Sequence, residues 1–345
     1  MAFLLDEYLG RVEEALESTL AASLLGAGDG LEREGDGLGH DQNQNPILVL
    51  TLGQARRPAP PRPDVALPAA CYEEPMLELA FERIEGARPR KTIAFLHGIL
   101  GSGGNLRTIA RRFVDARPSW TAWLIDLRGH GRSPKGTPDP SLEAAARDVV
   151  GLTARAAQPL VAVAGHSFGG KVALEALRIG TGSLEHVLTI DSMPGAREPM
   201  RGEDSALAVI ETLESLPRTF ASKSAFVDAI MAAGHGRALA QWLALSLERS
   251  DGGVRFALDL REVRALLVDY FARDLWPVVE QPPGDARLHL VIGDRSTSYS
   301  AADRERARAL AGDRVSVDLL PAGHRVHVDD PNGLLRVMLD RIPRP

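Results

Sequence analysis

The segment LVAVAGHSFGGKVALEAL, residues 160–177, constrains the fold more than any other part of the sequence. It begins with an apolar run typical of a buried strand, passes through the pentapeptide GHSFG at 165–169, and ends in a helical pattern. A chain that changes from strand to helix over so few residues turns sharply, and glycine on both flanks removes the Cβ atoms that would collide there. The turn holds the Ser167 hydroxyl clear of the backbone at a helix N-terminus, where free N–H groups favour a developing negative charge.

The residues of this segment disfavour two other interpretations. The first is a glycine-rich structural turn in which the serine is incidental, which the flanking strand and helix disfavour. The second is a phosphate-binding loop, because residues 165–171 also spell G-x-x-x-x-G-K. A phosphate loop needs Ser or Thr at the next position to hold Mg²⁺, and this chain has Val172 there.

A serine hydroxyl is too weakly acidic to attack a carbonyl unaided, so a nucleophilic Ser167 needs a base. In strand–turn–helix sites of this kind the base is a histidine late in the chain. His324, in LLPAGHRVHVDDP, directly follows the last predicted strand. We favour it over His327, which falls where a helix is predicted to begin.

The acid that orients the histidine has several candidates. Asp191 closes the predicted strand HVLTID, and Asp294 closes the next one, LHLVIGD. Both strand ends can approach the histidine loop. An acid after the later strand usually lies a few residues beyond the strand's glycine, where this chain has Ser296. The sequence therefore favours Asp191, with Asp294 and a residue such as Asp259 as alternatives.

An acyl-transfer site also needs N–H donors for the oxyanion. One is expected from the backbone amide of Phe168, directly after the serine. The second is expected from the loop HGILGSGGN, residues 97–105, through the amide of Ile99 or that of Leu100. Dinucleotide binding by this loop is excluded because G-x-G-x-x-G spacing is absent, position 106 being Leu.

From residue 76 to the C-terminus, short apolar runs alternate with helical patterns, which predicts an α/β fold with a mostly parallel sheet and helices on both faces. Nearly a hundred residues separate HVLTID from LHLVIG. They predict a helical lid over about residues 196–284, near the sheet edge where open α/β sheets bind ligands. The predicted lid helices are 204–216, 223–233, 237–248 and 260–271.

Residues 1–75 differ from the rest and predict an N-terminal extension. Apolar residues at three- and four-residue steps predict an amphipathic helix over 2–25, followed by a glycine-rich polar linker. A strand-like run at 47–52 and a proline-rich stretch at 57–68 complete it. No function is assigned to this extension.

Composition excludes several classes of protein. The formal net charge is −6, which disfavours a nucleic-acid partner. The single cysteine, Cys71, permits neither an intrachain disulfide nor a cysteine metal cluster. The acidic N-terminal segment does not look like a signal peptide, and no apolar stretch is long enough to span a membrane. A cytoplasmic protein without a metal or organic cofactor is the expectation.

Four segments in order, HGILGSGGN, DLRGHGRS, GHSFGG and AGHRVH, resemble the α/β-hydrolase superfamily. The resemblance implies a sheet of the eight-stranded type, and a bracing rather than catalytic role for DLRGHGRS at 126–133. More narrowly, GHSFGGKVAL, IDSMPG and AGHRVHVDDP resemble bacterial and organellar esterases and acyl thioesterases. In some of these the acid follows the strand that Asp191 closes here. Arg325 departs from the group, since many relatives have an aromatic residue at that position.

These observations together predict a serine hydrolase that cleaves carboxylic esters or thioesters through an acyl-enzyme. The alternatives are a C–C hydrolase or lyase on the same fold, and a non-catalytic binding protein. Eight apolar lid residues are candidates for an acyl pocket, although packing among the lid helices explains each of them equally well. They are Leu207, Ile210, Leu213, Phe226, Ile230, Trp242, Leu245 and Phe256.

Overall fold

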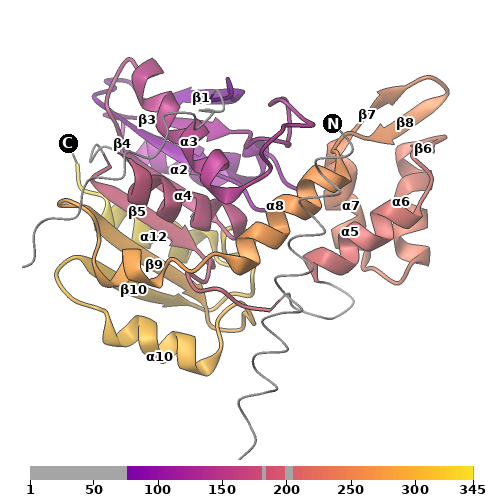
Figure 1. The fold of residues 1–345 in the computed structure, drawn as a ribbon. Coiled ribbons are helices and arrows are strands. Elements are labelled where there is room, and N and C mark those ends of the chain that lie inside the picture. The colour runs from indigo at the N-terminus through magenta and orange to yellow at the C-terminus, as the bar shows by residue number, and fades with distance from the viewer. Residues whose placement is uncertain (1–75, 181–183, 199–204, 345) are drawn as a thin grey trace, which may run out of the picture. The chain divides into compact units, whose positions relative to one another are not determined.

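The computed structural model describes residues 76–180, 184–198 and 205–344 (Figure 1). The extension predicted for residues 1–75, with its helix, linker, strand-like run and proline-rich stretch, lies outside the described residues. No helix in the described ranges is long and apolar enough to cross a membrane.

The described residues form a seven-stranded sheet in the order β1-β3-β2-β4-β5-β9-β10. β1 is antiparallel to β3, and all other neighbouring strands are parallel. The predicted mostly parallel α/β sheet is thus confirmed, with seven strands here where the resemblance implies an eight-stranded type. The strands are β1 (Phe81–Glu85), β2 (Lys91–Leu96), β3 (Trp120–Ile125), β4 (Leu160–His166), β5 (His186–Ile190), β9 (Arg287–Gly293) and β10 (Val315–Leu320).

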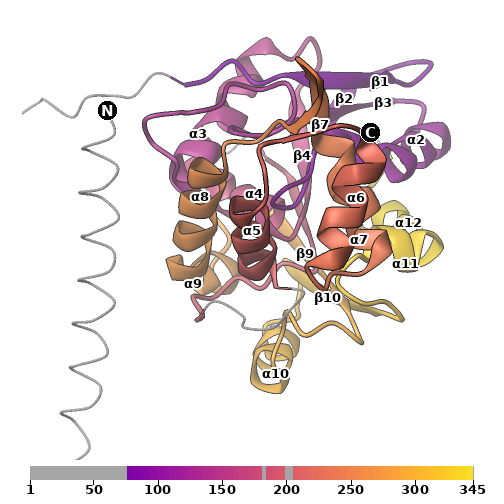
Figure 2. The same cartoon turned by 90° about the vertical axis from the view of Figure 1, so that its right-hand side faces the viewer.

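Helices cover both faces of the sheet because its central strands are apolar on both faces. In β2, Ile93 and Phe95 pack in one core with α2 and α12, whereas Ala94 and Leu96 pack in the other core with α3 and α4. Figure 2 shows these two helical layers on opposite sides of the sheet. The helices outside the long insertion are α2 (Arg107–Ala116), α3 (Leu142–Gly151), α4 (Phe168–Ile179), α10 (Ala301–Ala309), α11 (Val326–Asp329) and α12 (Pro331–Arg341).

The residues between β5 and β9, here called the insertion, form helices and a small second sheet (Figure 1). The sheet has the order β6-β8-β7 and is antiparallel. The insertion contains α5 (Ala206–Ser215), β6 (Thr219–Phe220), α6 (Lys223–Ala232), α7 (Arg237–Leu243), β7 (Leu247–Ser250), β8 (Gly253–Phe256), α8 (Leu260–Ala272) and α9 (Trp276–Glu280).

The helix predicted over 237–248 is wrong in its last residues. α7 ends at Leu243, and the chain enters β7 at Leu247. A two-residue turn, Asp251-Gly252, joins β7 to β8, with Gly252 at φ 81°. An Asp-Gly pair between β-prone residues is a strong hairpin pattern. The apolar residues before it continue the spacing of a helix, and for this reason the sequence predicts a helix over 237–248.

Lys171 joins the insertion to α4, the helix that follows the sharp turn at residues 165–169, here called the elbow. Its side chain is fully buried, and Nζ donates hydrogen bonds to the carbonyl oxygens of Gly195 at 2.8 Å, Tyr270 at 2.6 Å and Arg273 at 2.7 Å. Nζ also lies 4.5 Å from the centroid of the Tyr270 ring. One side chain therefore holds the beginning of the insertion and the end of α8.

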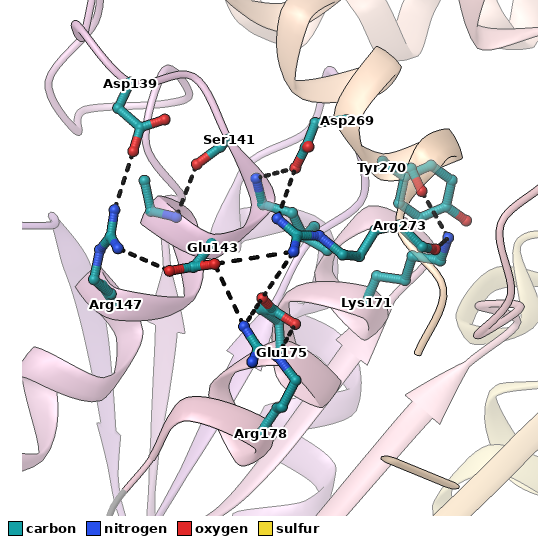
Figure 3. Close-up of polar contacts among 12 residues, drawn as sticks. Asp139, Ser141, Glu143, Arg147, Lys171, Glu175, Arg178, Asp269, Tyr270 and Arg273 are labelled. Carbon is teal, nitrogen blue, oxygen red and sulfur yellow. Dashed lines mark hydrogen bonds and ion pairs between the residues drawn. The ribbon is translucent and has the colours of Figure 1, made fainter. Parts of the chain in front are cut away.

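Ion pairs around the same junction tie α8 to α3 and α4 (Figure 3). The buried carboxylate of Glu175 pairs with Arg178 at 2.7 Å and with Arg273 at 3.8 Å. Asp269 on α8 accepts a hydrogen bond from the Leu142 amide at 2.7 Å. Because these contacts join three helices, the base of the insertion is fixed by polar contacts as well as by apolar packing.

The burial of Lys171 predicts a pH-dependent stability. Burial, together with the charge of Arg197, lowers the pKa of Lys171 from 10.5 to about 7. Between these two values the unfolded chain binds more protons than the folded protein, so the free energy of unfolding rises with pH. Relative to Lys171→Met, wild type should gain stability from pH 7.5 to pH 9, by at most about 1.4 kcal/mol per pH unit in urea denaturation.

The control for this measurement is Lys223→Met, which removes an exposed lysine at the start of α6. The difference between wild type and this control should not change with pH over the same interval. A constant difference between wild type and Lys171→Met would contradict the prediction.

Candidate active site

The elbow between β4 and α4 forces Ser167 into a rare backbone conformation, with φ 51° and ψ −117°. The turn is so tight that a Cβ on Gly165 would lie 2.1 Å from the Gly169 carbonyl oxygen. A Cβ on Gly169 would lie 2.5 Å from the Leu96 carbonyl oxygen at the end of β2. Both approaches are possible only for glycine, so the two flanking glycines of the pentapeptide fulfil the role that the sequence predicts for them.

Among the non-glycine residues that the structure describes, three have a positive φ: Leu100 at 63°, Ser167 at 51° and Asp191 at 46°. They follow the carboxyl ends of β2, β4 and β5, which are neighbours in the sheet. Strained backbone persists only where the surrounding structure enforces it, and it concentrates at functional sites. This edge of the sheet is therefore the candidate active site.

His324, in the loop after β10, meets Asp191 at this edge. Its Nδ1 lies 2.7 Å from Asp191 Oδ2, and the Asp191 side chain is 0% exposed. The carboxylate also accepts hydrogen bonds from the Gly293 amide at 3.0 Å and from the Ser296 hydroxyl. Asp191 is thus buried, fully hydrogen-bonded and fixed in orientation.

The other candidates for the acid, Asp294 and Asp259, and for the base, His327, have different surroundings. The Asp294 side chain is 46% exposed and lies 3.9 Å from Arg295. Asp259 caps α8, accepting hydrogen bonds from the backbone amides of the helix. His327 lies on α11 with its ring 4.7 Å from that of His166, and burial lowers its pKa to about 4. The structure brings neither aspartate to His324.

The loop after β2 lies directly against Ser167. A Cβ on Gly98 would be 3.4 Å from the Ser167 Cβ. The loop closes in a turn in which the Gly101 amide donates to the Gly98 carbonyl at 3.0 Å. The Leu100 amide donates to His130 Nε2 at 3.1 Å, which removes Leu100 as an oxyanion donor.

Two neutral histidines brace this loop. His97 Nδ1 donates to the Gly98 carbonyl at 2.8 Å while its Nε2 accepts from the Leu127 amide at 3.0 Å. His130 Nδ1 donates in the same way to the Arg128 carbonyl at 2.9 Å. Burial lowers the pKa of His97, and it lowers the pKa of His130 to about 3, so both rings stay neutral and can accept through Nε2. No cluster of metal-ligating residues occurs in the part of the chain that the structure describes.

The sequence overlooked several residues that shape the site. Ser298 hydrogen-bonds His324 Nδ1 through its hydroxyl at 2.9 Å, and His166 Nε2 donates to the His324 carbonyl at 2.9 Å. Ser296 occupies the position where an acid would be expected after the later strand, and its hydroxyl instead donates to the carboxylate of Asp191. Isolated serines in a loop carry no recognisable pattern, so only the three-dimensional structure reveals these contacts.

A cavity of about 510 Å³ opens onto Ser167 and His324. One wall comes from the loop after β2 and the other from the insertion. Of the eight apolar insertion residues predicted to shape a pocket, only Trp242 lines it in the described structure. Leu245 is exposed, and Ile210, Phe226 and Ile230 are buried in the core. The insertion contributes instead Ala206, Val209, Ala238, Leu239, Leu267 and Phe271.

The fold and this edge of the sheet match a known family. Residues 93–337 match the alpha/beta hydrolase family, and the chain belongs to it. The sn-1-specific diacylglycerol lipase ABHD11 of Mus musculus is 27% identical over 75% of this chain and 83% of its own length. A marine microorganism esterase has a similar structure, with a TM-score of 0.66 and 24% identity over 76% of this chain and 99% of its own.

A more distant structural neighbour is the thioesterase domain from the curacin biosynthetic pathway, with a TM-score of 0.57 and 18% identity. It covers 76% of this chain and 99% of that domain. The similarity to the lipase supports ester hydrolysis by a serine hydrolase, and the solved structures show the same fold.

We expect His130→Leu to lower kcat because it releases the loop after β2, and not because the protein loses its structure. Without the Nε2 acceptor, the Leu100 amide loses its partner and the Ile99 amide loses its fixed direction. Loss of one well-placed oxyanion donor costs about 100-fold to 1,000-fold, so we expect a smaller fall in kcat of roughly 10-fold to 100-fold. Steady-state hydrolysis of p-nitrophenyl butyrate gives this value.

His289→Leu is the matched control, because burial also lowers the pKa of His289 to about 3. His289 lies in β9, hydrogen-bonded to His186 at 3.1 Å, away from the loop. Per folded molecule, as scored by thermal unfolding, this control should keep its kcat. An equal loss in both variants would show that the effect of His130→Leu is merely structural.

Proposed function

We propose that the protein is a serine hydrolase that cleaves carboxylic esters or thioesters with Ser167 as nucleophile, His324 as base and Asp191 as orienting acid. The observation that carries this proposal is the 2.7 Å contact between His324 Nδ1 and the buried Asp191, together with the fact that His324 lines the same cavity as the strained Ser167. A histidine held at Nδ1 by a buried carboxylate presents Nε2 for proton transfer.

In the proposed reaction, Ser167 Oγ attacks the substrate carbonyl while His324 Nε2 takes its proton. The negative charge that develops on the carbonyl oxygen is stabilised by the backbone amides of Phe168 and Ile99. In the described structure neither amide donates a hydrogen bond to the protein, so both are available to the oxyanion. Phe168 opens α4, whose dipole adds to this stabilisation.

His324 then gives its proton to the leaving alcohol or thiol, which departs and leaves an acyl group on Ser167. The same histidine activates a water molecule that attacks the acyl-enzyme, and the carboxylic acid is released. Asp191 keeps the imidazole in one tautomer throughout and stabilises the imidazolium that forms twice per turnover. No step requires a metal or an organic cofactor.

The cavity suits an acyl chain on the side of the insertion. Val209, Leu239, Trp242, Leu267 and Phe271 give this wall an apolar surface. A relative named as a diacylglycerol lipase and a structural neighbour named as a thioesterase are both acyl hydrolases by name, which is consistent with an acyl ester or thioester as the substrate class here.

Paired aspartate variants test the assignment of the acid. We expect Asp191→Asn to lower kcat about 1,000-fold to 10,000-fold, because the amide favours the wrong imidazole tautomer. Asp294→Asn and Asp259→Asn should stay within about threefold of wild type, since neither carboxylate contacts His324. The measurement is kcat for p-nitrophenyl butyrate, with Ser167→Ala as the reference for lost chemistry.

The outcomes separate the possibilities. A large loss in Asp294→Asn with little change in Asp191→Asn would refute the assignment of the acid while leaving the nucleophile intact. Turnover that persists in Ser167→Ala would refute the proposed function as a whole. Folding of each variant is checked by thermal unfolding before the rates are compared.

A further inference from the structure

The cavity has a charge pattern that ester hydrolysis alone does not require. Two arginines, Arg197 and Arg325, line it, and no aspartate or glutamate does so among the described residues. Arg325 is exposed and so lies where the cavity meets solvent, whereas Arg197 is half-buried. A cleft lined by charge of one sign favours a ligand of the opposite sign.

Arg197 has no carboxylate partner among the described residues and is held by other contacts. Its Nη1 donates to the Ser298 carbonyl at 2.8 Å, and its guanidinium carbon lies 5.4 Å from the centroid of the Phe271 ring. Its Nε is buried and has no hydrogen-bond partner in the described structure. Other arginines of the described chain, such as Arg128 and Arg273, pair with carboxylates. A half-buried guanidinium that lines the cavity and pairs with no carboxylate of the described residues is well suited to bind an anionic group of a ligand there.

The position of Arg197 is close to the proposed chemistry. Ser298 links the two groups, since its carbonyl oxygen accepts from Arg197 and its hydroxyl hydrogen-bonds His324 Nδ1 at 2.9 Å. Arg197 and His324 are therefore bridged by one residue, and both line the same cavity as Ser167.

We propose that the protein acts on esters or thioesters that carry a carboxylate, and that Arg197 binds this carboxylate, with Arg325 attracting it at the entrance. This inference rests on the proposed function and defines its substrate class. The arrangement leaves the apolar wall formed by the insertion for the uncharged part of the substrate.

Matched ester pairs test the proposal and show which side of the ester carries the charge. In the first pair, mono-p-nitrophenyl adipate is compared with p-nitrophenyl isooctanoate, in which an isopropyl group replaces the carboxylate. In the second, p-carboxyphenyl hexanoate is compared with p-isopropylphenyl hexanoate. Each kcat/KM, corrected for spontaneous hydrolysis, is measured for wild type, Arg197→Gln and Arg197→Lys, so that the intrinsic reactivity of each ester cancels between proteins.

We expect Arg197→Gln to lower kcat/KM for one of the two anionic esters by roughly 10-fold to 100-fold, which corresponds to the loss of a charge-assisted hydrogen bond. The kcat/KM of the neutral ester in the same pair should fall far less. Arg197→Lys should recover part of the loss because it restores the charge without the planar fork. Arg295→Gln removes an arginine that is 63% exposed and outside the cavity, and should change neither ratio.

Loss confined to the adipate would place the carboxylate on the acyl side, and loss confined to the carboxyphenyl ester would place it on the leaving-group side. If Arg197→Gln lowers kcat/KM equally for the anionic and the neutral ester in both pairs, the proposed carboxylate subsite is wrong. The same conclusion follows if the variant hydrolyses all the esters as well as wild type does. If wild type hydrolyses none of the four esters and Ser167 is unreactive, the proposed function itself fails.

Discussion

The close approach of α4 to the ends of β2 and β4 is the constraint on which the rest of this structure depends. Only glycine at positions 165 and 169 permits that approach, and it forces Ser167 to a positive φ. The same approach brings the loop after β2 against the serine and aligns the N-terminus of α4 with it. The cost of the strained residue, of the order of 1–3 kcal/mol, is offset by the buried cores on both faces of the sheet.

Buried polar groups around this constraint hold the neighbouring loops and the insertion in position. His97 and His130 remain neutral because they are buried, and each uses one ring nitrogen to contact the loop after β2 and the other to contact the segment after β3. Lys171, four residues beyond the serine, holds the insertion through three carbonyl oxygens. α4 therefore couples the elbow to the insertion that forms the opposite wall of the cavity. A change at the base of the insertion should thus be felt at the elbow through a single rigid helix.

The sequence predicts the α/β sheet, the elbow and the location of the insertion because these depend on local patterns: apolar runs, glycine spacing and element order. It identifies Asp191 and His324 as partners only as a preference, since their contact joins residues 133 positions apart. The hairpin of β7 and β8 was missed although Asp251-Gly252 marks it. The lining of the cavity was largely wrong, because an apolar face such as that of Ile210 or Phe226 does not show whether it meets a neighbour or a ligand. Arg197 and Ser298 carry no recognisable sequence pattern, and their contact arises only from the packing of the insertion on the loop after β9.

The central claim is that Ser167 is an activated nucleophile, and covalent labelling tests it most directly. Folded protein is treated with a fluorophosphonate, digested and mapped by mass spectrometry, with Ser167→Ala treated in parallel. The account predicts one stoichiometric adduct on the peptide that contains Ser167, and none in the variant. Folded wild-type protein that remains unlabelled, or an adduct on another residue that persists in Ser167→Ala, would contradict it.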